Sequence, residues 1–194
     1  MKRLVDIVLA LPAAILLMPV FIVIAIWIKL DSHGPVFYLQ ERIGKNRRPF
    51  RIFKFRTMHT DADKKGLLTV GGKDPRVTGA GYLLRKYKLD ELPQLINVLI
   101  GNMSLVGPRP EVKKYVDLYS PAQLAVLSVK PGITDYASIE YADENELLAR
   151  SADPENTYIH EVMPAKLQLN LRYIEEQGLM TDLRIIFQTI RKIL

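Results

Sequence analysis

The 194-residue sequence contains no cysteine, which excludes disulfide bonds, thiolate nucleophiles, iron–sulfur clusters and zinc sites built on cysteine. It has only three histidines, and their scatter argues against a metal centre made of imidazoles. Acidic residues are scarce in one region: residues 29–60 carry eight basic and two acidic side chains, and the rest of the chain is nearly balanced although the net charge is +6. Apolar residues make up 48% of the chain, so most of it is expected to fold.

An uncharged run of 22 residues, 7–28, lies near the N-terminus. At about 1.5 Å per residue it is long enough to cross the hydrocarbon core of a membrane. A cleavable signal peptide fits poorly, because the run is too long and no small-residue cleavage site follows it. A protein of this size could hardly enclose so long a helix that is apolar all round. Residues 1–33 are therefore predicted to form a membrane segment.

The flanks of this run predict how it meets the membrane. Lys2 and Arg3 precede it and Lys29 follows it, and the positive-inside rule places both flanks on the cytoplasmic side. Pro19, near the middle, lacks a backbone donor and favours a bend there. We therefore expect a re-entrant helix, with a kinked single-pass anchor as the alternative. Asp6 is expected to pair with Lys2 or Arg3 one turn earlier.

Residues 34–194 are predicted to form one mixed α/β domain that is mostly helical. Strands are expected at 36–40 and 50–56 around a turn at 45–49, a polar loop at 60–80, and helices at 81–88, 90–100, 120–129 and 164–177. Thr181 is expected to cap a last helix whose apolar face carries Leu183, Phe187 and Ile190. That amphipathic helix could rest in the membrane interface or pack on the core, and the core is slightly favoured.

Cations alternate with apolar residues at 50–56, and this pattern has two readings. The basic face could lie against anionic lipid headgroups, or Lys54 or Arg56 could bind a phosphate group. Nucleic acid is not an expected partner, because the basic cluster is short and directly follows a segment predicted to be embedded in lipid.

Residues 83–110 carry the strongest chemical signal. Asp90 and Glu91 precede Pro93, so a helix could begin at Asp90 with this residue as an ordinary N-cap. Arg85 lies about one turn earlier, and Arg109 lies in a rigid turn between two prolines. Guanidinium groups match phosphate oxygens, and Mg²⁺ would relieve the repulsion between a phosphate and the two carboxylates. The spacing thus indicates membrane-tethered phosphate chemistry, while the N-cap alternative stays open.

Eight short motifs stand in one order along the chain, at residues 28–32, 34–37, 40–44, 53–58, 74–78, 89–95, 103–110 and 131–134. This order resembles the small monotopic phosphoglycosyl transferases of the bacterial sugar transferase family. The resemblance implies a re-entrant membrane helix and a compact domain on the cytoplasmic face of the bacterial inner membrane, with a short β-hairpin and interfacial amphipathic helices. It further implies transfer of a sugar-1-phosphate from a UDP-sugar to undecaprenyl phosphate with release of UMP, the first membrane step of glycan assembly.

The resemblance also assigns roles to residues. Asp90 would be the nucleophile that forms a phosphosugar–aspartate intermediate with Mg²⁺ at its carboxylate, and Glu91 would assist deprotonation of the lipid phosphate. Arg109, with Arg85 and either Lys54 or Arg56, would hold the diphosphate. A loop with three of the motif positions would face the nucleotide: Pro131, Gly132 and Thr134.

Some positions depart from the family pattern. Met18 stands where serine is common before the bend, and residues 135–138 resemble the branch that handles N-acetylated amino sugars. The amphipathic last helix makes a homodimer conceivable. The competing hypothesis is a non-catalytic membrane-surface module that binds anionic lipid, in which Asp90 and Glu91 only cap a helix.

Overall fold

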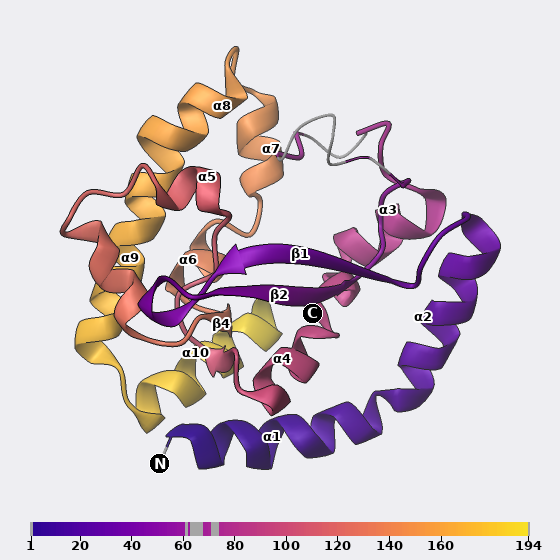
Figure 1. Cartoon of the computed structure of the whole chain (residues 1–194), viewed down its shortest axis with the longest axis horizontal. Helices are drawn as coiled ribbons and strands as arrows, with labels where there is room; N and C mark the ends of the chain where they lie inside the picture. Colours follow the sequence, from indigo (N-terminus) through magenta and orange to yellow (C-terminus); the bar gives the residue numbers. More distant parts are fainter. Residues whose placement is uncertain (1, 61, 63–67, 71–73, 194) are drawn as a thin grey trace.

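The computed structural model describes residues 2–60, 62, 68–70 and 74–193. The elements, in chain order, are α1 (Lys2–Leu16), α2 (Met18–Asp31), β1 (Phe37–Ile43), η1 (Lys45–Arg47), β2 (Pro49–Phe55), α3 (Gly79–Lys86), η3 (Leu89–Glu91), α4 (Gln94–Ile100), β3 (Ser104–Val106), α5 (Lys113–Val116), η4 (Gln123–Ser128), β4 (Gly132–Thr134), α6 (Tyr136–Glu140), α7 (Glu144–Ala149), α8 (Pro154–Thr157), η5 (Tyr158–Val162), α9 (Met163–Glu176) and α10 (Leu179–Ile193). The β1–β2 hairpin crosses the middle of the molecule, with α1 and α2 along one border and α7–α9 at the opposite side (Figure 1). The mixed, mostly helical α/β class predicted from the sequence is confirmed.

The predicted hairpin is confirmed, and it is longer than expected. β1 and β2 pair antiparallel from Phe37 opposite Phe55 to Ile43 opposite Pro49. The chain reverses through Asn46 and Arg47, whose positive φ angles of 56° and 60° suit the tight turn of a twisted hairpin. Part of the polar loop expected at 60–80 (residues 61, 63–67 and 71–73) lies outside the described residues.

The apolar N-terminal run forms two helices rather than one. α1 and α2 meet at Leu17 with a bend of 58°, directly before Met18 and Pro19. Within the described residues no single helix has the length and apolar character needed to span a membrane, but the bent pair together has both. The bend predicted at Pro19 is confirmed, because proline at the second position of α2 begins a new helix where it would interrupt a continuous one.

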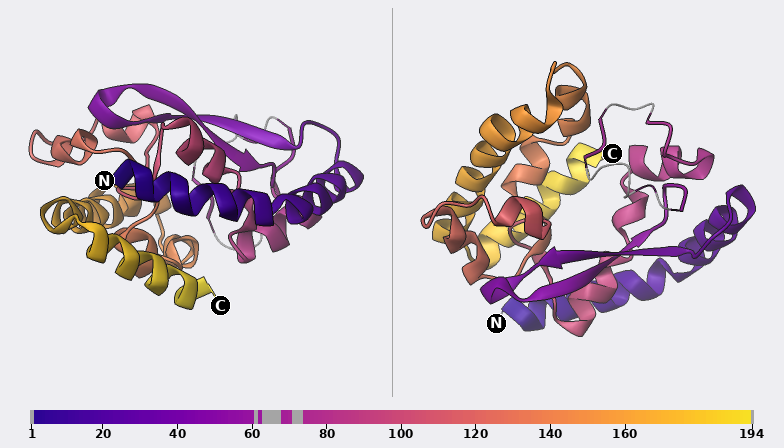
Figure 2. Two further views of the ribbon diagram at one scale, coloured as in Figure 1. Left: turned by 90° about the horizontal axis from the view of Figure 1, so that it is seen from below. Right: turned by 45° about the horizontal axis from the view of Figure 1, so that its top comes forward.

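α1 runs along the border of the molecule beside the hairpin (Figure 2), and its polar side chains join it to the rest of the protein. The Asp6 side chain is buried, and it accepts hydrogen bonds from Ser104 Oγ at 2.9 Å and from the Leu105 amide at 3.0 Å. The pairing of Asp6 with Lys2 or Arg3 predicted from the sequence is therefore wrong. Lys2 instead pairs with Asp182, and Arg3 donates to the carbonyls at the end of α4. Each partner comes from a segment distant in sequence, which the local helical spacing does not reveal.

The far end of α2 is held by two side chains. Arg56 donates to the carbonyl oxygens of Ile28 in the last turn of α2 and of Ser32 and His33 just beyond it. Asp31 accepts a hydrogen bond of 3.1 Å from the Ala80 amide in the first turn of α3. Both helices of the bent pair are therefore fastened to the domain.

Strands β3 and β4 run parallel and place two motifs side by side. A Cβ on Gly132 would lie 2.1 Å from the Gly107 amide nitrogen, so only glycine permits this approach. Tyr173 and Ile185 pack against Val106 beneath the strands. Ile185 on α10 is fully buried, whereas Leu183, Phe187 and Ile190 are exposed. The slight preference for packing the predicted apolar face of this helix on the core is not confirmed, and Thr181 lies within α10 rather than capping it.

Candidate active site

The two adjacent carboxylates lie in a short 3-10 turn rather than at the start of an α-helix. η3 follows Lys88, which has a left-handed φ of 55°, and α4 begins only at Gln94. Asp90 is therefore not the N-cap of α4, and the predicted helix over 90–100 is wrong in its first turn. The left-handed conformation of Lys88 separates α3 from η3. In a 3-10 turn, consecutive side chains point about 120° apart. Asp90 and Glu91 thus face different surroundings.

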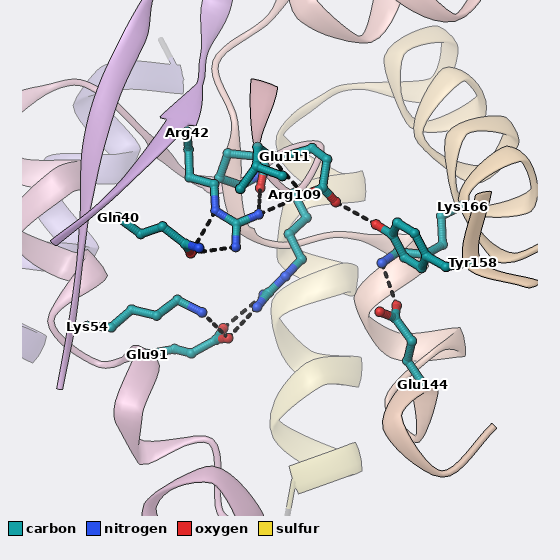
Figure 3. Close-up of polar contacts among 11 residues, drawn as sticks. Gln40, Arg42, Lys54, Glu91, Arg109, Glu111, Glu144, Tyr158 and Lys166 are labelled. Atoms are coloured by element: carbon teal, nitrogen blue, oxygen red, sulfur yellow. Dashed lines mark hydrogen bonds and ion pairs between the residues drawn. The ribbon is translucent and has the colours of Figure 1, made fainter. Parts of the chain in front are cut away.

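Glu91 is fully engaged with cations (Figure 3). Arg109 grips both of its oxygens, with Nη1 to Oε2 at 2.9 Å, and Lys54 Nζ lies 3.1 Å from Oε1. Burial opposes ionisation of this carboxyl, but the charges of Arg109 and Lys54 outweigh it and hold the pKa of Glu91 well below its ordinary value. The same ion pair raises the pKa of Arg109. In this arrangement Glu91 is therefore an anion that fixes two basic side chains.

Asp90 has the opposite environment. Only 8% of the residue is exposed, and no described residue forms a hydrogen bond or ion pair with its side chain. Burial and the neighbouring negative charge of Glu91 raise the pKa of Asp90, against the pull of Lys54, Arg85 and Arg109. A buried carboxylate with uncommitted oxygens is more reactive than a paired one, because no donor has to be displaced from it.

Burial also lowers the pKa values of two cations that face this carboxylate. The pKa of Lys54 falls because its amine is desolvated, although the charge of Glu91 partly restores it. Arg85 is half-buried and has a lowered pKa for the same reason, offset first by Asp90. Two weakly solvated cations beside an unpaired carboxylate attract an anionic ligand.

Buried side chains from distant segments position the two partners of Glu91. The Asn97 amide on α4 accepts a hydrogen bond from the Phe53 amide and donates to the Arg51 carbonyl, both at 2.8 Å, and so holds the strand that carries Lys54. Asp135, which is fully buried, accepts a 3.0 Å hydrogen bond from the Arg109 amide. Both residues were missed from the sequence, because an amide or carboxylate partner on another element leaves no local pattern.

A pocket of about 150 Å³ adjoins Arg109 on the side away from Glu91. Arg42 on β1 donates to Gln40 and to Glu111, and Tyr158 donates to the other oxygen of Glu111 at 2.5 Å. Figure 3 shows this network beside the outstretched Arg109 side chain. The sequence prediction did not include these residues, although Gln40 and Arg42 belong to one of the recognised motifs.

The structure gathers four of the predicted residues around Asp90: Lys54, Arg85, Glu91 and Arg109. It does not bring Arg56 there, because that guanidinium is buried against the end of α2. The segment from Pro131 to Thr134 is not the expected loop but includes the buried strand β4. The Pro131 carbonyl accepts from the Ser104 amide, and the Thr134 hydroxyl bonds to Thr189. Together with Gly132, these residues are hydrogen-bonded to the segment that precedes Arg109.

The described residues include no cluster of three or more acidic or histidine side chains that could enclose a metal ion. Mg²⁺ commonly binds through one or two carboxylates together with substrate phosphates and water, and does not need such a cage. The uncommitted oxygens of Asp90 fit this mode, whereas Arg109 and Lys54 already occupy those of Glu91. The site therefore suits an ion that arrives with a phosphate ligand.

Comparison with known proteins gives a consistent result. The chain is similar to a UDP-N-acetylgalactosamine-undecaprenyl-phosphate N-acetylgalactosaminephosphotransferase of Aeromonas hydrophila, with 40% identity over 100% of this chain and 43% of the relative. It is 38% identical to a UDP-glucose:undecaprenyl-phosphate glucose-1-phosphate transferase of Escherichia coli over 99% of the chain and 40% of the relative. A Caulobacter vibrioides protein of the same description is 36% identical over 100% of the chain and 69% of that relative.

The chain thus spans about two fifths of the length of the first two relatives. The profile of the family described as bacterial sugar transferase matches residues 1–194. The protein therefore belongs to the bacterial sugar transferase family.

Proposed function

We propose that this protein transfers a sugar-1-phosphate from a UDP-sugar to undecaprenyl phosphate and releases UMP. The observation that carries the proposal is the contrast between two adjacent carboxylates: Glu91 is bound by two cations, and the buried Asp90 is bound by none within the described residues. A scaffold gains nothing from a buried unpaired carboxylate, which costs free energy. A nucleophile, in contrast, requires carboxylate oxygens that no donor already occupies.

In the proposed first step, an Asp90 oxygen attacks the sugar-bearing phosphorus of the donor. A phosphorus–oxygen bond to Asp90 forms, the bond to the UMP oxygen breaks, and UMP leaves with the electron pair. In the second step, an oxygen of the lipid phosphate attacks the same phosphorus and the aspartyl bond breaks, which regenerates the carboxylate. Two displacements through one site suit a donor that arrives from water and an acceptor that stays in lipid.

Arg109, Arg85 and Lys54 surround the space where the phosphates would lie. Phosphoryl transfer depends mainly on positioning and charge neutralisation, and these side chains supply both. When Arg109 turns from Glu91 to the donor phosphate, the pKa of Glu91 rises, so that Glu91 can then accept the remaining proton of the lipid phosphate. Mg²⁺ bound at Asp90 and the donor phosphates would withdraw negative charge from the diphosphate.

We further propose that the bent helix pair enters the membrane and returns, with the domain on the cytoplasmic face of the inner membrane. Exposed apolar side chains cover the outer surface of α1 and α2, among them Leu4, Val8, Ile15, Val23 and Trp27. Exposed apolar residues of α10, including Met180 and Phe187, extend this surface. Basic residues at both ends favour the same side of the bilayer.

The test is to incubate the protein in nanodiscs with Mg²⁺, undecaprenyl phosphate and a panel of UDP-sugars, and to measure UMP release. UMP should appear with one class of donor, and mass spectrometry of protein treated with donor alone should show a sugar-phosphate adduct on Asp90. UMP release that requires both substrates at once and leaves no adduct would contradict the covalent route. No turnover with any donor would support the non-catalytic membrane-surface module instead.

A further inference from the structure

We propose that the pocket beside Arg109 binds the sugar of the donor. This inference rests on the proposed function and adds the location of its specificity. The pocket lies between the hairpin and the segment α7–α9, and its walls include Gln40, Glu111, Glu144, Asn145 and Asn170. None of these residues belongs to the Asp90 cluster, so the mechanism above leaves the pocket without a role.

The walls are rich in hydrogen-bond acceptors that are already held in place. Glu111 accepts from Arg42, from Tyr158 and from the Val112 amide. Glu144 accepts from Lys166, whose ammonium group also lies 5.6 Å from the centre of the Tyr158 ring. Each carboxylate has about four lone-pair sites, so these pairs leave acceptor capacity for a ligand. A set of fixed acceptors is what a molecule with several hydroxyl groups requires.

Asn170 provides the second, independent observation. The residue is only 5% exposed, and its Oδ1 atom is buried without a hydrogen-bond partner among the described residues. It lines the pocket next to the Arg109 side chain. Buried polar atoms are nearly always hydrogen-bonded, so the unpaired acceptor of this wall residue has capacity for a ligand that donates.

The sugar fits this wall better than the other parts of the donor. Arg42 and Lys166 are already paired with the two carboxylates of the wall, so these cations are not free to bind the diphosphate. A uracil ring has a single N–H donor, whereas a hexose has several hydroxyl donors. Arg109 borders the pocket and also grips Glu91 beside Asp90. Because the phosphate is bonded directly to the sugar, a sugar in the pocket would place that phosphate at Arg109, within reach of the proposed nucleophile.

The experiment compares Asn170→Leu with Gln168→Leu, a matched change at an exposed position of the same helix. UDP-N-acetylgalactosamine and UDP-glucose are used as donors, and UDP as the ligand that lacks the sugar. Asn170→Leu should raise KM for the donor that turns over by about tenfold, because one hydrogen bond is lost. kcat and UDP affinity should stay within about twofold of wild type. Gln168→Leu should change none of these quantities.

Thermal unfolding separates a binding role from a structural one. Asn170→Leu removes an unpaired buried acceptor, so the melting temperature should be unchanged or higher. Asn145→Ala, a half-buried pocket residue, offers a second variant with the same expected rise in KM.

An equal loss of UDP and UDP-sugar affinity would assign the pocket to the nucleotide, and unchanged affinity for both would also overturn the proposal. If the wild type releases no UMP, the proposed function fails. Binding of UDP-sugar and of UDP to the wild type and to Asn170→Leu, measured by calorimetry, would still decide whether the pocket binds the sugar.

Discussion

Arg109 lies between two charged regions that differ in which of their side-chain atoms are paired. On one side, the turn at Asp90 and Glu91 contains a buried carboxylate, that of Asp90, without a partner among the described residues. On the other side, the pocket carboxylates Glu111 and Glu144 are paired, and the neutral Oδ1 of Asn170 has no partner in the described part of the chain. In the proposed function this difference separates chemistry from recognition: the carboxylate of Asp90 attacks the donor phosphorus, and the amide oxygen of Asn170 binds the sugar.

The two regions also differ in what their ion pairs do. Arg42 and Glu111 hold the pocket wall in shape, together with Tyr158. Glu91, in contrast, holds Arg109, and in the proposed function a phosphate of the donor replaces Glu91 as the partner of this arginine. Four predictions test this contrast, and they run from the largest expected effect to the smallest.

The first prediction removes the uncommitted charge. Asp90→Asn should reduce UMP release by at least about a thousandfold, because the amide cannot form the phosphoaspartate. Its melting temperature should not fall, since burial raises the pKa of Asp90 and the charged form therefore costs stability near neutral pH. UMP release by Asp90→Asn at a rate near wild type would refute the assignment of the nucleophile.

The second prediction concerns the ion pairs of Glu91, next to Asp90. Glu91→Gln should lower the free energy of unfolding by about 2 kcal/mol, because Arg109 and Lys54 lose their buried counter-charge. UMP release should also fall by one to two orders of magnitude, about the size of a lost positioning group. Urea unfolding measures the first effect.

Glu155→Gln is the matched control, since Glu155 pairs with Lys114 on the exposed surface. It should cost well under about 1 kcal/mol. Equal losses of unfolding free energy in the two variants would mean that burial does not strengthen the ion pairs of Glu91.

The third prediction concerns pH. Because the pKa of Asp90 is raised, kcat/KM should begin to fall at a pH above the ordinary range of an aspartic acid, as protonation removes the nucleophile. The stability that Glu91 contributes should be lost at a lower pH than the activity, because the pKa of Glu91 is depressed: this contribution is present above its unfolded pKa and is lost as pH falls through the folded value. An activity limb at the ordinary aspartate pKa would contradict the buried environment of Asp90.

The fourth prediction addresses the pocket. Tyr158→Phe removes one hydrogen bond to Glu111 and should lower the free energy of unfolding by about 1 kcal/mol. kcat should change less than about threefold, because the hydroxyl lies on the binding side of Arg109. A fall in kcat comparable to that of Glu91→Gln would show that the two regions do not act separately.

Local patterns in the sequence predicted many of the elements. Strand patterns at residues 36–40 and 50–56 around a turn at 45–49 predicted the hairpin, and Pro19 predicted the bend, because both depend on backbone geometry within a few residues. The start of α4 was wrong, since the left-handed conformation of Lys88 arises where two segments meet. Arg56 likewise could not be distinguished from Lys54 by pattern, because both are cations in the predicted strand 50–56.

The sequence by itself determined which chemical groups are available: an apolar run with basic flanks, two adjacent carboxylates, and arginines near them. Only the tertiary structure decided their pairing. Glu91 is paired with Arg109 and Lys54, Asp90 has no partner among the residues that the structure describes, and Asp6 is bonded to Ser104. The physical reason is that partners and burial come from segments far apart in the chain, and these set the pKa and reactivity of a side chain.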